Sequence, residues 1–316
     1  MKVRFHLPDF SGKFRFNLIF ASMLEQWPQY FREGVEIASF YGVFSPSLWN
    51  GGRIQSDTCD RSLISTIIKT FNNKNIPLRF TFTNPVLEEK HLEDKFCNMV
   101  LNLADNGLNE VIVVSPILEN YIREKYPNYK VTSSTCKRIT DPEKLSEELE
   151  KDYHIVVIDY DFNNKFDILE KIPNKEKCEL LVNACCQPNC KLRSEHYQKL
   201  GIQQIEYCEH IKKYPNTPFD FEKFIEKDGS PSLKCQCMKK NIIDIKNLST
   251  HITPDDIWEK YVPMGFNQFK IEGRTSGIIN LAETYLYYMV KPECIEEARL
   301  MLMHNLEANG VLICNE

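Results

Sequence analysis

Cysteines are concentrated in one part of the chain, where their thiols could bind a metal. The stretch LVNACCQPNCKLRSEHY, residues 181–197, carries three of them within six positions. Further thiols follow downstream, at Cys208, Cys235 and Cys237. Metal binding, disulfide formation and simple packing are three different uses of such a set.

The stretch FKIEGRTS, residues 269–276, concentrates charge instead. Lys270, Glu272 and Arg274 alternate along it, so on a β-strand they would point to one side. Three charges on one face of a buried strand are costly unless they are paired or functional. One interpretation is a structural ladder of ion pairs. The other is an anion-binding and acid–base site, in which Arg274 binds a carboxylate or phosphate while Glu272 and Lys270 set the charge.

The composition favours a cytoplasmic protein. The 316 residues are 42% hydrophobic, with a formal net charge of -5, which allows a large core and gives no sign of bulk nucleic-acid binding. The N-terminal MKVRFHLPDF lacks the apolar segment of a signal peptide, and no stretch approaches the roughly 20 apolar residues that cross a bilayer. In the cytoplasm the twelve cysteines stay reduced. Three lie in apolar patterns and are expected to be buried packing residues: Cys97, Cys294 and Cys314.

Short β-rich segments alternate with amphipathic helical segments along most of the chain. Strands are expected near residues 3, 35, 76, 109, 129, 154, 178 and 267, several without polar alternation, as in strands covered on both faces. Apolar spacing predicts helices over 16–31, 59–73, 91–107 and 141–152. Eight such units predict a TIM-like (β/α)8 barrel. A doubly wound open sheet is the alternative, but no G-x-G-x-x-G turn follows the first strand.

We expect one barrel domain over residues 1–316, with a long insertion between strands seven and eight. Roughly eighty residues separate these strands, far more than an ordinary crossover needs. The insertion, residues 186–263, contains the unexplained cysteines from Cys186 to Cys237.

The carboxyl ends of the barrel strands are where chemistry is expected. The residues predicted at this rim include His6, Tyr41, Thr83, Asn84, Ser115, Ser133–Cys136, Asp159, Asp161, Asn183 and Cys185. We expect Arg274, Asn183 and Asn84 to bind a substrate there. The loop GVFSPSLWNGGR, residues 42–53, adds Trp49 to cover a ligand and Arg53 to hold an anion, although an ordinary surface loop with a packed tryptophan is an alternative.

The region GFNQFKIEGRTS, followed by the helical AETYLYYMVKPE, resembles the signature region of the collagenase-like peptidase family U-32. The cysteine segment after the seventh strand is also similar to that family's cluster-binding segment. The order of elements extends the resemblance over most of the chain, although the specific motifs are short. The resemblance implies a TIM-like barrel. Better understood members are oxygen-independent hydroxylases of tRNA or of quinone precursors that carry a [4Fe–4S] cluster on four cysteines, and other members are described as proteases.

Four cysteines are the candidate ligands of such a cluster, which needs four converging thiolates. Cys186 and Cys190 form a close pair, because Pro188 and Asn189 between them favour a turn. Two more ligands are expected from Cys235 and Cys237, with Cys185 and Cys208 as substitutes. A closed zinc site would use the same thiols, and reduced thiols without metal are the third possibility. The spacing differs from zinc ribbons and from the more widely spaced cysteines of the hydroxylases.

Three functions follow from these residues. The leading hypothesis is an iron–sulfur enzyme that hydroxylates or otherwise modifies a small-molecule or RNA-borne ring without oxygen, with His196 as a proton donor and a redox partner as electron source. The second is a peptidase of the U-32 type, although no G-x-S-x-G or H-E-x-x-H motif is present. The third is a non-catalytic binding scaffold stapled by its metal.

Overall fold

The structure is a computed structural model that describes residues 2–312, and it confirms the closed barrel. Eight parallel strands pair in chain order, and β1 also pairs with β8 to close the ring. Each strand falls within a segment expected from the sequence. The strands are β1 Val3–Pro8, β2 Val35–Gly42, β3 Leu78–Phe82, β4 Glu110–Val113, β5 Lys130–Ser133, β6 Ile155–Val157, β7 Cys178–Leu181 and β8 Gln268–Lys270.

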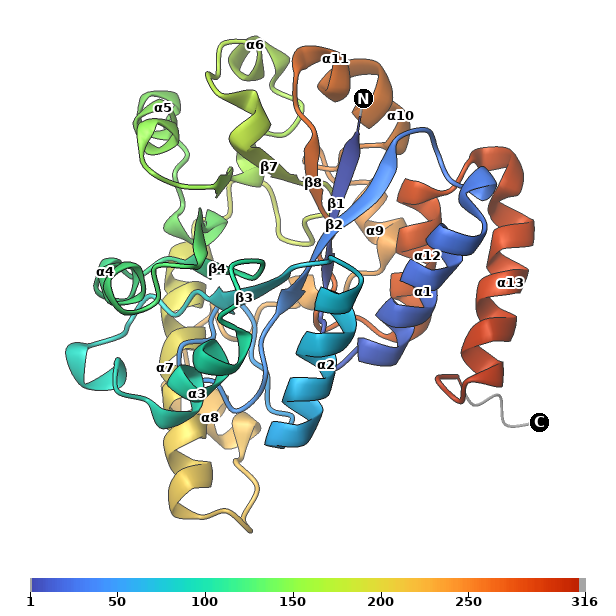
Figure 1. The fold of residues 1–316 in the computed structure, drawn as a ribbon. Helices are drawn as coiled ribbons and strands as arrows, with labels where there is room; N and C mark the ends of the chain where they lie inside the picture. The colour runs from blue at the N-terminus through green and yellow to red at the C-terminus, as the bar shows by residue number, and fades with distance from the viewer. Residues whose placement is uncertain (1, 313–316) are drawn as a thin grey trace.

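Single helices connect the first seven strands, and they surround the barrel (Figure 1). These are α1 Phe14–Gln26, α2 Arg61–Asn73, α3 Lys95–Ala104, α4 Pro116–Lys125, α5 Pro142–Glu150 and α6 Phe166–Leu169. The predicted helix over 16–31 ends early because Trp27 precedes Pro28, and a residue before proline disfavours the helical conformation. Helix α5 begins as predicted, with the Asp141 carboxylate capping the backbone N–H groups of Glu143 and Lys144.

The segment between β7 and β8 carries five helices, and two more follow β8. The first group is α7 Arg193–Lys213, α8 Phe221–Asp228, α9 Ile242–Lys246, α10 Pro254–Asp256 and α11 Val262–Met264, with a π-helical turn at Ile257–Tyr261; the second is α12 Ile278–Met289 and α13 Ile295–Ala308. Helices α1, α12 and α13 lie together on one flank (Figure 1). Helix α7 reaches back to α3, where Lys212 Nζ lies 2.5 Å from Asp94 Oδ2.

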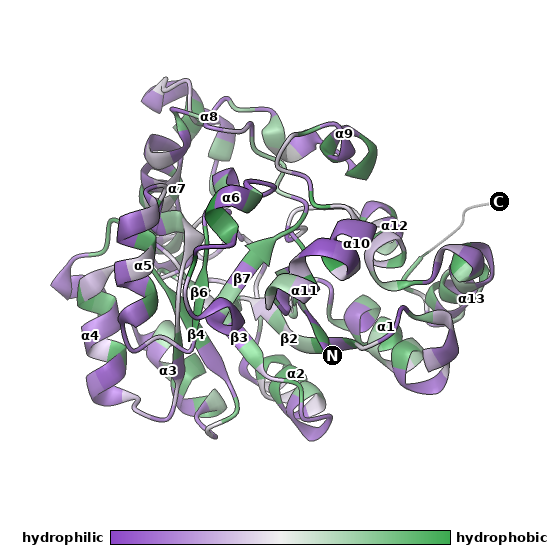
Figure 2. Ribbon diagram, turned by 90° about the horizontal axis from the view of Figure 1, so that it is seen from above, coloured by the Kyte–Doolittle hydropathy of each residue, from purple (hydrophilic) through white to green (hydrophobic). Residues whose placement is uncertain are grey.

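Alternating side chains separate an apolar outer layer from a polar barrel interior. In β3, Leu78, Phe80 and Phe82 belong to the apolar core between strands and helices. Arg79 alternates with them and pairs with Glu179 of β7. Because β3 and β7 are not neighbours in the barrel, this contact crosses its interior. Figure 2 shows apolar colour on β6 and β7 and polar colour over much of α4 and α5.

The cysteines predicted to be packing residues differ in burial. Cys97 is fully buried in the core and Cys294 is half-buried against it. Cys314 lies outside the described residues.

Candidate functional site

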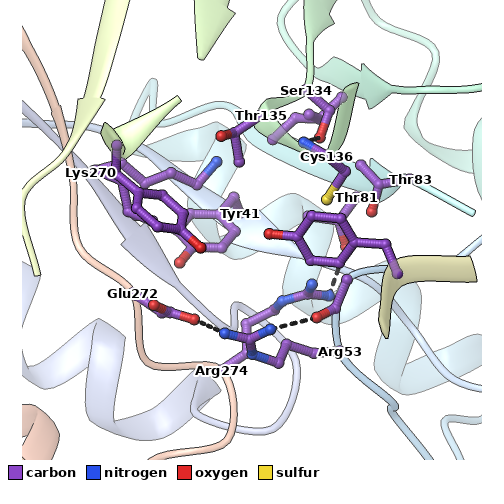
Figure 3. A pocket seen from close by; sticks show the side chains of 15 residues that line it. Tyr41, Arg53, Thr81, Thr83, Ser134, Thr135, Cys136, Lys270, Glu272 and Arg274 are labelled. Atoms are coloured by element: carbon purple, nitrogen blue, oxygen red, sulfur yellow. Dashed lines mark hydrogen bonds and ion pairs between the residues drawn. The ribbon is translucent and has the colours of Figure 1, made fainter. Parts of the chain in front are cut away.

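A pocket of about 80 Å³, lined by several charged and hydroxyl side chains, lies at the carboxyl ends of the strands (Figure 3). All three predicted charges, Lys270, Glu272 and Arg274, line it, together with the predicted Arg53. Its other walls come from β2 to β7 and from α7, namely Tyr41, Gly52, Thr81, Thr83, Ile112, Ser134, Thr135, Cys136, Tyr160, Leu181 and Tyr197. We call this the rim pocket.

The three charges of the FKIEGR stretch have different partners. Lys270 Nζ lies 3.1 Å from Glu179 Oε1 in the barrel interior, and Glu272 forms an ion pair with Arg53. Arg274 donates only to neutral oxygens, the side chains of Asn50 and Thr81 and the carbonyl of Gly51, each at 2.9 Å. Within residues 2–312 it has no carboxylate at ion-pair distance. Two of the charges are therefore paired, as a structural ladder would require, and the third is a cation without a counter-ion in the pocket.

Lys270 is poised to exchange a proton near neutral pH. Burial lowers the pKa of its ammonium group to about 8, against the opposing attraction of Glu179. The ammonium also lies 4.1 Å from the centre of the Tyr41 ring, a favourable cation–π distance.

The loop after β2 brings Arg53 between the rim pocket and the cysteines. Its guanidinium donates to Glu272, to the Gly52 carbonyl and, at 3.5 Å, to Cys185 Sγ. Gly51 makes this path possible, because a Cβ at that position would lie 2.1 Å from the Thr83 carbonyl oxygen. Gly51 is therefore required for a close backbone crossing, whereas Gly52 adopts a positive φ of 70° that favours glycine.

All four predicted cysteine ligands line the same pocket, a second one of about 50 Å³. Cys186 and Cys190 come from the turn after β7, and Cys235 and Cys237 from the loop after α8. The rest of the lining consists of Arg53, Tyr160, Cys185, Leu192, Arg193, His196, Tyr197 and Ser232. Arg53, Tyr160 and Tyr197 line both pockets. The cysteine pocket and the rim pocket therefore share a wall.

Buried ion pairs hold the turn between Cys186 and Cys190. Asn189 adopts the left-handed conformation with φ 53°, and its N–H donates to Asp161 Oδ1 at 2.9 Å. Asp161 also pairs with Arg193, whose guanidinium stacks 4.0 Å above the Tyr160 ring and reaches Asp159 at 3.2 Å. The turn expected from the sequence is present, and two aspartates from the end of β6 position it.

The second cysteine loop is tied to the first by a lysine. Lys240 Nζ donates to the Cys185 carbonyl at 3.0 Å and lies 4.0 Å from Cys237 Sγ. The Cys237 N–H lies 3.4 Å from Cys235 Sγ. Cys208, by contrast, is buried on α7 beside Gln204 and does not line the pocket, whereas Cys185 does.

The cysteines surround a space rather than a single point. Among residues 2–312, no three His, Cys, Asp or Glu side chains are close enough to hold one metal ion. Burial raises the pKa of Cys186 to about 12, and repulsion from Cys190, Cys237 and Cys185 adds to the effect of burial.

His196 lies in the cysteine pocket and not in the rim pocket. Its Nδ1 contacts the Ser232 carbonyl at 2.7 Å, so this nitrogen carries the proton and Nε2 is an acceptor. Burial lowers the pKa of His196 below its ordinary value, which favours the neutral ring.

Three residues predicted to bind substrate make hydrogen bonds to the backbone of the site. Trp49 is fully buried and donates to the His91 carbonyl at 2.8 Å. Asn84 donates to the carbonyls of Leu48 and Gly201, each at 3.1 Å. Asn183 brackets Glu272, donating to its carbonyl at 3.0 Å and accepting from its N–H at 2.6 Å. None of the three lines the rim pocket.

A charge cluster that was not predicted from the sequence lies beneath the rim pocket. Glu179 is fully buried and contacts Arg79, Lys270 and, at 3.4 Å, His6. Arg79 Nε lies 3.1 Å from Glu110 as well. The signal was present, since LRFTF and CELL each place one charged residue inside an apolar strand.

Comparisons with known proteins give one structural likeness. No protein-family model and no curated protein matches the sequence. A solved structure, the U32 peptidase Mk0906, is similar with a TM-score of 0.48 and 11% sequence identity, covering 86% of this chain and 94% of the other. Within the described part of the chain, no helix is both long and apolar enough to cross a membrane.

Proposed function

We propose that this chain is an iron–sulfur enzyme of the U-32 type, with a [4Fe–4S] cluster in the cysteine pocket and an anionic substrate or co-substrate in the rim pocket. The observation that carries the proposal is the shared wall between the two pockets. Four cysteines from two distant segments line one side of that wall, and the unpaired Arg274 lies on the other. A cluster bound in the first pocket and a ligand bound in the second would therefore be separated only by Arg53, Tyr160 and Tyr197.

Zinc and a four-iron cluster would use the same thiols, but they differ in the spacing of the sulfurs that they require. Tetrahedral zinc with Zn–S bonds of about 2.3 Å requires sulfurs about 3.8 Å apart. In a four-iron cluster each thiolate binds a different iron, so the sulfurs stand farther apart around a larger body.

Orphaned donors in the pocket wall also suit a cluster. Arg193 is 1% exposed, and its Nε and Nη1 have no hydrogen-bond partner within the described residues. Unsatisfied buried donors are costly. The sulfurs of an anionic cluster would accept from them, and such hydrogen bonds are among the factors that set cluster potentials.

Each group of residues in the two pockets would then have its own role. Cys186, Cys190, Cys235 and Cys237 would hold the cluster, which supplies electron transfer when bound. Arg274 would bind a carboxylate or phosphate in a bidentate manner, and Lys270 would hold or release a proton at Nζ. In the wall, Tyr160 and Tyr197 are buried and would exclude water from the space between the two groups. By resemblance to the family, the reaction would be oxygen-independent hydroxylation or a related modification of a small-molecule or RNA-borne ring.

The peptidase alternative finds less support in the geometry. A cysteine nucleophile needs a lowered pKa and a base oriented by a third group. Burial instead raises the pKa of Cys186, and His196 contacts a backbone carbonyl rather than a carboxylate.

Anaerobic reconstitution with iron and sulfide tests the proposal. The wild-type chain should turn brown, absorb broadly near about 400 nm and bind four irons and four sulfides. Alanine at any one of Cys186, Cys190, Cys235 or Cys237 should lower the iron content. Cys208→Ala is the matched control, because this buried thiol lies outside the pocket, and it should retain the wild-type iron content. A folded wild-type protein that stays colourless and iron-free would refute the proposal.

A further inference from the structure

Basic residues gather around the cysteine pocket of an otherwise acidic chain. The two segments that carry the proposed ligands, residues 186–195 and 232–246, contain six basic and two acidic residues, whereas the chain as a whole has a net charge of -5. The local excess of positive charge therefore coincides with the cysteines.

Three of these lysines are exposed and lie within two residues of a pocket cysteine in the chain. Lys191 follows Cys190 directly, Lys234 precedes Cys235, and Lys239 follows Cys237 by two residues; all three side chains are exposed. Because successive Cα atoms are about 3.8 Å apart, each lysine must lie close to a pocket cysteine. The described residues offer none of the three a carboxylate at ion-pair distance. We call Lys191, Lys234 and Lys239 the lysine collar.

Exposed apolar side chains accompany the collar. Leu192 is 41% exposed and lines the pocket, and Ile243 on α9 is 69% exposed. Protein interfaces combine an apolar centre with a charged rim. Cys190, Cys235 and Cys237 are themselves only half-buried, so a cluster held by them would lie near this surface.

We propose that the lysine collar docks an acidic electron-carrier protein, which delivers electrons to the cysteine pocket. This inference rests on the proposed function. One electron leaves the reduced carrier, which is oxidised, and enters the bound cluster, which is reduced; no bond forms or breaks. Complementary charge accelerates such encounters and orients the partner, and the partial exposure of Cys190, Cys235 and Cys237 leaves their side of the pocket within reach of a carrier.

RNA is the other polyanion that such a collar could attract, and this surface suits it less. Specific RNA sites stack unpaired bases on aromatic rings or arginine planes. Neither of the two segments contains an aromatic residue. Their single arginine, Arg193, is buried and paired with Asp159 and Asp161.

Stopped-flow reduction of the reconstituted protein tests the inference, with a reduced plant-type ferredoxin as the acidic probe. The triple variant K191Q/K234Q/K239Q should be reduced about tenfold more slowly at low ionic strength and should lose most of the salt dependence. Reduction by the small methyl viologen radical cation, which the collar would repel rather than attract, should not become slower in this variant. The matched control is K69Q/K144Q/K171Q, which removes three exposed, unpaired lysines elsewhere and should leave ferredoxin reduction unchanged.

The outcomes separate the inference from the proposed function. A wild-type protein that binds no cluster overturns both. A brown protein whose collar variant accepts electrons from ferredoxin at the wild-type rate overturns the inference alone. A collar variant that keeps this rate but loses affinity for bulk tRNA also overturns it and assigns the surface to RNA.

Discussion

Replacing Glu179 by glutamine should strongly destabilise the barrel although it hardly changes the shape of the side chain. The carboxylate is fully buried and faces Arg79, Lys270 and His6. Burial by itself would raise the pKa of Glu179, but attraction to Arg79 and Lys270 holds it below its ordinary value. Glutamine removes the charge and leaves two buried cations with Glu110 as the remaining carboxylate nearby.

The expected loss follows from the contact with Lys270. Two unit charges 3.1 Å apart attract each other by about 5 kcal/mol at an effective dielectric constant of about 20. Removing one partner of a buried ion pair typically costs about 3–5 kcal/mol. Globular proteins of this length, 316 residues, have an unfolding entropy of about 0.7 kcal/mol/K. A loss of about 4 kcal/mol should therefore lower the Tm by about 6 °C.

Thermal and urea unfolding of a double-mutant cycle would measure this loss. Glu179→Gln should cost about 4 kcal/mol, and the pair E179Q/K270M should cost clearly less than the sum of the two single changes. Glu293→Gln is the control, because this exposed glutamate has no ion pair with any residue from 2 to 312, and it should stay within about 0.5 kcal/mol of wild type. Strictly additive losses, or an unchanged Tm for E179Q, would refute the electrostatic account of the barrel interior.

Two further predictions concern the loop after β2 and the pH dependence of stability. Gly51→Ala should destabilise the protein by about 2 kcal/mol or more, since its methyl group would lie 2.1 Å from the Thr83 carbonyl oxygen. Gly277→Ala is the control and should change the Tm little, because a methyl group there meets no atom within 4 Å. Equal losses of stability in the two variants would contradict the close backbone crossing at Gly51. In the folded protein the pKa of Lys270 is about 8, against an ordinary value of 10.5, so between these pH values the unfolded chain binds the extra proton. The free energy of unfolding should therefore rise by about 3 kcal/mol from pH 8 to pH 10.5 relative to that of Lys270→Met. Denaturant titrations at several pH values would measure it. The same change with pH in the wild type and in the variant would contradict the lowered pKa.

The barrel could be predicted from local patterns. Eight apolar runs alternating with amphipathic segments identified every strand, because a strand buried under helices needs apolar side chains along its length. Helix α5 could be recognised from Asp141 and Pro142 in the same way. Helix ends were less certain, as the early end of α1 before Pro28 illustrates.

The roles of polar residues at the rim could not be read from the same patterns. Trp49 and Asn84 follow strands as a ligand-binding residue would, yet their polar atoms bond to backbone carbonyls of neighbouring loops. Glu179 went unnoticed because its partners are contributed by other strands. A sequence shows which side chains can donate or accept a hydrogen bond or carry a charge, but the fold determines which groups they contact.

Residue types and spacing alone pointed to Cys186, Cys190, Cys235 and Cys237, and to the charges of FKIEGR as a group. Only the tertiary structure decided that two cysteine pairs separated by α7 and α8 line one pocket, and that Arg53, Tyr160 and Tyr197 join this pocket to the one at the barrel mouth. Local sequence governs propensity and burial over a few residues, whereas a site is defined by distances between segments that the chain brings together only when the barrel closes.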